Sequence, residues 1–257
     1  MKFNTKCVHG SGKPDSTGAI SPAIYMSSTF SHPKLGDTTG YQYTRESNPT
    51  RDRLEQLIAG LEDGKDALAF SSGMAAVDAV FHLFSPGDHI ILGDDLYGGS
   101  IRMFTNIYEQ NGIEFTYVGT SDLDAVKAAF KPNTKAVYIE TPTNPMMEIT
   151  DVRALCALAH ERNALVIIDN TFLSPYFQKP LTLGADIVVH SGTKFIGGHH
   201  DVISGFTIVN DEELAAKLRL TYKTVGACLS AMDSWLVIRG VKTLALRMEQ
   251  HQKNAIA

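Results

Sequence analysis

The sequence predicts an α/β protein built on a mainly parallel sheet with helices on both faces. Short apolar runs alternate with amphipathic stretches from about residue 49 onward. Short apolar runs bounded by turn residues are typical of buried strands, and their alternation with helices is typical of a parallel sheet. The strand candidates are residues 67–70, 88–92, 113–118, 136–139, 165–169, 187–190 and 203–209.

The predicted helices follow from start signals and apolar spacing. The first begins at Asn48-Pro49-Thr50, because proline is preorganised for the first helical position, and it ends before Gly64. Its leucine and isoleucine side chains recur at helical spacing. Residues 73–84, 123–130, 152–162 and 235–247 carry similar helical patterns.

Residues 1–46 differ from the rest of the chain. Glycine, proline, serine and aspartate cluster at residues 11–15, and a second loop-forming stretch lies at residues 30–34. Little periodicity separates the two stretches. We therefore expect this segment to be an arm rather than part of the sheet.

The charge, apolar runs and cysteine content of the chain argue against several classes of protein. The formal net charge of −5, with no basic block, argues against nucleic acid as a partner. No apolar run is long enough to cross a bilayer, and the first residues lack an apolar signal core. Only three cysteines occur, Cys7, Cys156 and Cys228, which favours a reducing compartment. We expect a soluble cytoplasmic protein.

Lys194 is the first candidate for chemistry. It belongs to Ser191-Gly192-Thr193-Lys194, which directly follows the apolar run at residues 185–190. Open α/β sheets place ligands at the carboxyl ends of their strands. A lysine there could form a Schiff base with an aldehyde cofactor while the two hydroxyls bind its phosphate. The same lysine could equally cap a loop.

Asp169 ends a second apolar strand candidate, residues 165–169. A buried carboxylate could hold the proton on the ring nitrogen of pyridoxal phosphate (PLP), which acts as an electron sink in that form. A helix cap and a metal ligand are alternative roles.

The segment Ser71-Ser72-Gly73-Met74 precedes another helical pattern. A helix N-terminus exposes unpaired N–H groups and so can bind an anion such as a phosphate. A simple turn before the helix is the alternative.

Seven segments together resemble one family. They are GYQYTRESNPTRDRLE, AFSSGMAA, GDDLYGGSIRMF, YIETPTNP, IIDNTF, LGADIVVHSGTKFIGGHHDVISG and DSWLVIRGVKTLALRM. In these segments, and in their order, the chain resembles the cysteine/methionine-metabolism (trans-sulfuration) family of fold-type-I PLP-dependent enzymes. That family includes cystathionine γ-lyase, cystathionine β-lyase and cystathionine γ-synthase.

The resemblance implies roles for individual residues. Lys194 would be the Schiff-base lysine, Asp169 the partner of the ring nitrogen and Tyr97 the aromatic ring stacked on PLP, and these three would be catalytic. The remaining cofactor-binding residues would be Tyr43, Arg45, Gly73, Met74, Asn144, Ser191 and Thr193. Tyr43 and Arg45 would reach the phosphate from a neighbouring subunit; a surface cation–π pair is the alternative for these two, and a core position for Tyr97.

Asn144, Arg102 and Arg51 would line the substrate pocket by the same resemblance. The residue after Tyr97-Gly98 is Gly99, where methionine γ-lyases tend to carry a cysteine, so that activity is disfavoured. The neighbours His199 and His200 do not predict a metal site, because adjacent side chains of an extended segment point to opposite faces.

The predicted organisation has three parts: an arm at residues 1–46 that contacts a neighbouring subunit, a PLP-binding large domain at 47–245, and the start of a C-terminal domain at 246–257 that family members continue. The expected partners are a sulfur amino acid and further copies of the chain in a dimer of dimers. The expected activity is carbon–sulfur cleavage of cystathionine, with cystathionine γ-synthase or an O-acylhomoserine sulfhydrylase as the alternative. A PLP-fold fragment without turnover is a second alternative.

Overall fold

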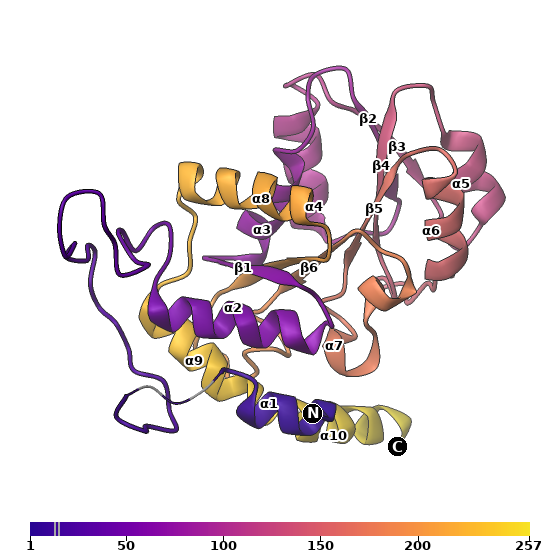
Figure 1. The fold of residues 1–257 in the computed structure, drawn as a ribbon. Coiled ribbons are helices and arrows are strands. Elements are labelled where there is room, and N and C mark those ends of the chain that lie inside the picture. The colour runs from indigo at the N-terminus through magenta and orange to yellow at the C-terminus, as the bar shows by residue number, and fades with distance from the viewer. Residues whose placement is uncertain (13, 15) are drawn as a thin grey trace.

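The computed structural model describes residues 1–12, 14 and 16–257 and contains a seven-stranded sheet in the order β1-β7-β6-β5-β4-β2-β3 (Figure 1). The strands are β1 (Asp66–Phe70), β2 (His89–Gly93), β3 (Glu114–Val118), β4 (Thr134–Glu140), β5 (Leu165–Asp169), β6 (Ile187–Ser191) and β7 (Gly205–Val209). Each coincides with a predicted strand, and ends differ by a residue or two.

Parallel pairing dominates the sheet, as predicted. Strand β7 is antiparallel to its two neighbours, β1 and β6, while β2, β3, β4, β5 and β6 pair in parallel. The carboxyl ends of β4, β5 and β6 therefore meet at one edge of the sheet. Ligands bind at this edge in open α/β sheets.

Helices and helical turns connect the strands. They are α1 (Phe3–His9), α2 (Pro49–Leu61), α3 (Gly73–Phe81), α4 (Gly98–Met103), a π-helical turn (Phe104–Tyr108), α5 (Leu123–Ala129), α6 (Val152–His160), α7 (Ser174–Phe177), a 3-10 turn (Pro180–Leu183), α8 (Glu212–Val225), α9 (Ala231–Val241) and α10 (Leu244–Ile256). Several begin at a capping side chain, which satisfies an N–H group that has no partner within the helix. The caps of this kind are Asn48, Ser72, Asp122, Asp151, Asp211 and Ser230.

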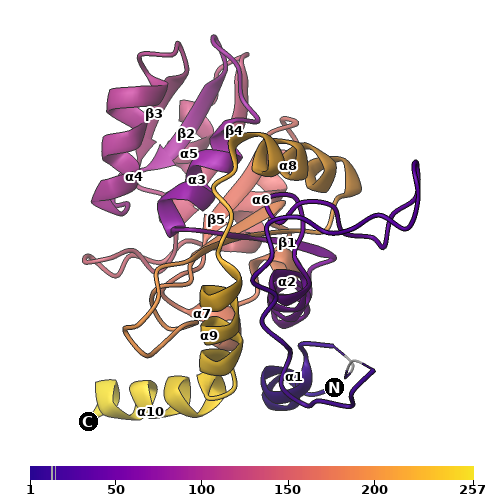
Figure 2. The same cartoon turned by 90° about the vertical axis from the view of Figure 1, so that its left-hand side faces the viewer.

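The sheet is covered on both faces (Figures 1 and 2). Alternate strand residues pack into different cores: Tyr138 and Ile167 lie in a core with residues of α3 and α8, whereas Val137 and Ile168 pack with residues of α5 and α6. A third core joins α2 and α9 to β6 and β7. Strands β1, β2, β4, β5, β6 and β7 are thus largely buried, as continuous apolar runs predict, whereas the edge strand β3 is partly exposed.

Residues 1–46 are not all loop. Residues 3–9 form α1, and Cys7 is buried against α2 and α10 in the third core. Residues 16–46 form no helix and loop outward from the body before α2 begins (Figure 1). Their contact with a neighbouring subunit remains a prediction. The loop-rich composition of residues 1–46 concealed this short helix.

The single helical pattern predicted at residues 235–247 is two helices. Lys242 and Thr243 close α9 with bonds to the carbonyls of Arg239 and Gly240, and α10 begins at Leu244. Met248 of α10 is buried in the third core. The predicted domain boundary at 245/246 falls inside α10, and the domain division remains a prediction.

Candidate functional site

Three polar residues end adjacent strands at the ligand-binding edge of the sheet. They are Glu140 on β4, Asp169 on β5 and Ser191 on β6, and Glu140 is the register partner of Asp169. Thr171 links two of these ends: its hydroxyl donates to Asp169 Oδ1 at 2.5 Å and accepts the Ser191 N–H at 2.8 Å. The Thr171 N–H also donates to Asp169 Oδ1, at 3.0 Å. One Asp169 oxygen is thereby fixed, and the other can accept a bond from a ligand.

Burial changes the acidity of both carboxyls. Glu140 is 7% exposed, and burial together with the negative charge of Asp169 raises its pKa to about 8. Burial also raises the pKa of Asp169, although the hydrogen bonds from Thr171 act in the opposite direction. Tyr138 is buried beside Asp169, and interaction with the Tyr138 hydroxyl is among the influences that lower the pKa of Asp169. A polar cluster of this kind is typical of a functional site.

Tyr97 joins the cluster through its main chain. Its N–H donates to Glu140 Oε2 at 3.2 Å, while its side chain is 55% exposed at the start of α4. A side chain at Gly99 would begin 2.4 Å from Tyr97 Cε1, so Gly99 is what leaves space for the ring. The Tyr97 ring is therefore accessible, while the Tyr97 main chain is held by Glu140.

The first turn of α3 lies against the end of β6. Ser72 caps the helix by accepting the Ala75 N–H at 3.0 Å, so the N–H groups of Gly73 and Met74 have no intrahelical acceptor. A Cβ on Gly73 would lie 2.8 Å from Ser191 Cβ. This close approach brings two free N–H groups beside the Ser191 hydroxyl, which is a suitable donor set for a phosphate.

Lys194 follows Ser191 in a tight turn. Its N–H donates to the Ser191 carbonyl at 3.3 Å, and its side chain is exposed. Thr193 is less available than expected, because its hydroxyl donates to the Ser204 carbonyl at 3.2 Å and accepts the Ser204 N–H at 3.1 Å. The structure therefore brings together Lys194, Ser191, Asp169 and the start of α3.

Tyr43 and Arg45 are not part of this group within the chain. The Arg45 guanidinium lies 5.3 Å from the centre of the Tyr43 ring and donates to the Lys223 carbonyl. Its stem packs against Gly226, which ends α8. Tyr43 is 42% exposed.

The three predicted substrate contacts occupy different environments. Arg51 is fully buried and donates to the carbonyls of Thr44 and Leu229, so its charge is held inside the chain. Arg102 is exposed on α4, one turn after Tyr97. Asn144 is exposed in the loop after β4. Arg51 as placed here supports the fold and offers no donor to a pocket.

Sequence reasoning missed three members of the cluster: Tyr138, Glu140 and Thr171. Each lies in a segment that carried the family resemblance, YIETPTNP or IIDNTF. The sequence offered one signal for Glu140, which is its position. Glu140 directly follows the strand candidate at residues 136–139, and Asp169 ends the strand candidate at residues 165–169. The strand order needed to recognise that these two strands are adjacent comes from the structure.

The cluster suits PLP by the chemistry of its donors. The close approach of Gly73 to Ser191 provides donors for the phosphate, Asp169 offers a half-buried acceptor for a ring nitrogen, and Lys194 provides an amine. Among residues 1–12, 14 and 16–257, no group of three or more His, Cys, Asp or Glu could hold a metal ion. No helix in those residues is long and apolar enough to cross a membrane.

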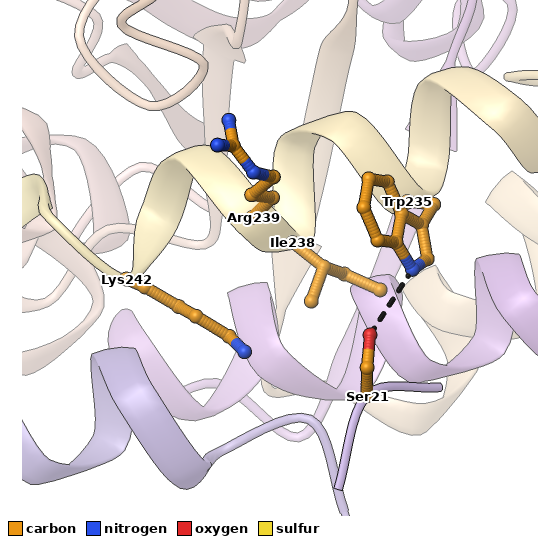
Figure 3. Close-up of a pocket in the computed structure, with 5 residues that line it drawn as sticks. All are labelled: Ser21, Trp235, Ile238, Arg239 and Lys242. Carbon is orange, nitrogen blue, oxygen red and sulfur yellow. Dashed lines mark hydrogen bonds between the residues drawn. The ribbon is translucent and has the colours of Figure 1, made fainter. Parts of the chain in front are cut away.

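A separate shallow pocket lies where α9 meets the arm (Figure 3). Its lining residues are Ser21, Trp235, Ile238, Arg239 and Lys242. The Trp235 Nε1 donates to Ser21 Oγ at 3.3 Å, which ties the arm to the helix. None of these residues belongs to the strand-end cluster.

Comparison with known proteins agrees with the geometry. The family described as Cys/Met metabolism PLP-dependent enzyme matches residues 4–257. Cystathionine gamma-lyase of Bacillus subtilis (strain 168) is 51% identical over 256 residues, 99% of this chain and 68% of that protein. Cystathionine beta-lyase of Lactococcus lactis subsp. cremoris (strain MG1363) is 50% identical over 254 residues, 98% of this chain and 67% of that protein.

A solved structure matches over the whole chain. It is cystathionine gamma-lyase from Lactobacillus plantarum complexed with L-serine, with a TM-score of 0.98 and 50% identity. The match covers 100% of this chain and 67% of that one. The chain thus spans about two thirds of the length of the proteins it resembles.

Proposed function

Because the chain belongs to the family of Cys/Met metabolism PLP-dependent enzymes, we propose that it cleaves the carbon–sulfur bond of cystathionine or a related sulfur amino acid. The observation that carries the proposal is the strand-end cluster, in which Asp169, Ser191 and the Lys194 turn meet the first turn of α3. The names of its relatives at 51% and 50% identity support cystathionine as the substrate.

PLP, when bound, supplies an aldehyde for covalent attachment of an amine and a ring that accepts an electron pair. The N–H groups of Gly73 and Met74 and the Ser191 hydroxyl bind the phosphate. Asp169 holds a proton at the ring nitrogen, and Thr171 fixes the orientation of its carboxylate. These groups are positioned before a ligand arrives, so they need little reorganisation.

Lys194 would hold the cofactor through its Nζ, and the same amine, once free, would accept the proton from the substrate Cα. Tyr97 would contact the cofactor through its exposed ring, while its N–H is held by Glu140. For cleavage at the γ carbon a second proton, on Cβ, must also move. Lys194 and the Tyr97 hydroxyl are the groups of this chain that relay it.

We propose that the substrate is cystathionine rather than methionine. Gly99 stands where methionine γ-lyases tend to carry a cysteine. A side chain there would begin 2.4 Å from the Tyr97 ring and displace it.

We also propose a dimer of dimers in the cytoplasm. Tyr43 and Arg45 belong to the arm, and within their own chain Arg45 donates to the Lys223 carbonyl rather than to the strand-end cluster. The arm suits contact with a neighbouring subunit whose phosphate site these two residues would complete. Cys7, Cys156 and Cys228 are free thiols, which suits a reducing compartment.

Product analysis tests the proposed reaction. The protein loaded with PLP is incubated with cystathionine, and separately with methionine. We expect faster release of a 2-oxo acid and ammonia from cystathionine. Cysteine with 2-oxobutanoate would indicate γ cleavage, and homocysteine with pyruvate would indicate β cleavage. Efficient formation of cystathionine from cysteine and an O-acylhomoserine, with cystathionine left intact, would replace the lyase by the synthase; no turnover of any of these would leave a non-catalytic PLP-binding protein.

A further inference from the structure

The turn that carries Lys194 is closed by its own backbone. The Gly197 N–H donates to the Gly192 carbonyl at 2.8 Å, and the Gly198 N–H donates to the Lys194 carbonyl at 2.8 Å. These bonds fix the shape of the turn but not its position relative to the strand ends. Contacts from outside the turn must supply that position.

Arg247 of α10 supplies such a contact. Its Nη1 donates to the carbonyl of Phe195, the residue after Lys194, at 2.6 Å. Its Nη2 donates to the Gly240 carbonyl at the end of α9 at 3.1 Å, and its Nε donates to Thr243 Oγ1 at 3.1 Å. One planar guanidinium therefore joins the lysine turn, the end of α9 and the link to α10. A lysine ammonium cannot reproduce three donors in this fixed plane.

Two glycines let the helices touch the turn directly. A Cβ on Gly240 would lie 2.2 Å from the Gly197 carbonyl oxygen, so α9 packs on the backbone of the turn. A Cβ on Gly198, where φ is +70°, would lie 2.2 Å from Arg247 Cζ. The guanidinium occupies the space that a side chain at Gly198 would need. The Lys194 turn therefore contacts α9 on one side and the Arg247 guanidinium on the other.

We propose that Arg247 is a positioning residue that clamps the Lys194 turn against α9 and so fixes where Lys194 Nζ reaches. Gly240, Thr243 and Arg247 all lie in the segment DSWLVIRGVKTLALRM, to which the proposed reaction assigns no task. Misplacement of a reacting group by about 1 Å can cost about a hundredfold in rate. The contacts of Arg247 with the turn belong to the fold, whereas their consequence for Lys194 rests on the proposed function.

The test compares Arg247→Met and Arg247→Lys with the control Arg239→Met. Arg239 is exposed on α9, and its guanidinium points away from the tips of Ile238 and Lys242 (Figure 3). The control removes the same group from the neighbouring helix without touching the turn. Hydrogen exchange is measured on the protein with and without added PLP, together with the pH midpoint of the visible absorption of bound PLP, kcat and KM.

We expect amide exchange in residues 192–198 to accelerate at least tenfold in Arg247→Met, with a smaller change in Arg247→Lys and none in Arg239→Met. Exchange in β5 and β6 should stay unchanged. With PLP bound, the pH midpoint should shift and kcat should fall about tenfold to a hundredfold at nearly constant KM.

Unchanged exchange in the turn of both Arg247 variants overturns the clamp. Uniformly faster exchange across the sheet overturns it too, because Arg247 would then act only on global stability. Local acceleration with unaltered kcat and pH midpoint overturns the effect on Lys194. If Arg247→Met fails to fold, Arg247→Lys decides among these outcomes. Failure of the unaltered protein to turn over cystathionine would count against the proposed function alone, since exchange still reports on the clamp.

Discussion

Replacing Glu140 by glutamine removes a titratable carboxyl from the cluster and keeps an oxygen that can accept the Tyr97 N–H. Glu140 is 7% exposed and is the strand partner of Asp169. Burial and the Asp169 charge raise its pKa from 4.5 to about 8. In the unfolded chain the same carboxyl ionises near its ordinary value.

The size and sign of the effect follow from proton linkage. Between pH 4.5 and about 8 the unfolded chain has lost the Glu140 proton while the folded chain still holds it. The unfolded state thus binds fewer protons, and stability falls as the pH rises through this window. At ~1.4 kcal/mol per pH unit, the total loss has an upper limit of about 5 kcal/mol. The buried amide that glutamine introduces adds a cost of about 1–3 kcal/mol that does not depend on pH.

The assay is urea unfolding of the cofactor-free protein at about pH 5.5, 7 and 8.5. We expect the stability of Glu140→Gln relative to the unaltered protein to increase by several kcal/mol across this range. Glu114→Gln is the control, because Lys131 lowers the pKa of Glu114. Removing the Glu114 carboxyl therefore changes the pH dependence of the unfolding free energy only below about pH 4.5. Parallel pH profiles for the unaltered protein and Glu140→Gln would refute the reasoning.

Three further variants test other parts of the site. Asp169→Asn keeps the shape but loses the charge at the ring nitrogen, so PLP should still bind while kcat falls by about a thousandfold, at ~1.4 kcal/mol per tenfold; near-normal kcat would mean that another group holds that proton. Mixing Arg45→Ala with Lys194→Ala and exchanging the subunits should partly restore activity. In each hybrid interface one site carries both substitutions, so the other carries neither and is active. No recovery after proven exchange would place Arg45 in its own subunit's site. Gly205→Ala puts a Cβ 2.1 Å from the Ser72 carbonyl oxygen, so unfolding should need at least about 2 kcal/mol less and PLP affinity should fall; an unchanged melting temperature and affinity would contradict this contact.

The strands of the sheet were predictable because buried strands have continuous apolar sequences. Residues 165–169 were predicted as a strand and form β5 with the same bounds. Strand order was not predictable, since it depends on pairing between segments far apart in the chain. The reversal of β7 is one example, because its apolar sequence pattern does not differ from that of the parallel strands, yet it pairs antiparallel with both β1 and β6.

Short helices and interruptions escaped prediction for a related reason. α1 has seven residues and is stabilised by packing on α2 and α10 rather than by its own propensity. The break between α9 and α10 carries no proline or glycine at Lys242-Thr243, and bonds to Arg239 and Gly240 end the helix there.

Within the candidate site, position along the chain pointed to Lys194 and Asp169, whereas the environment of the other residues depends on contacts. Arg51 resembles a ligand-binding arginine in sequence, yet it is fully buried and donates to the carbonyls of Thr44 and Leu229. Glu140 becomes visible only through its pairing with Asp169. Contacts across the fold of this kind cannot be read from local pattern.

Borohydride reduction of the PLP-loaded protein, followed by peptide mapping, tests whether Lys194 holds the cofactor. We expect one pyridoxyl group, fixed on the peptide that contains Lys194, and no label in Lys194→Ala. Label on a different lysine, or label that persists in Lys194→Ala, would contradict the site described here.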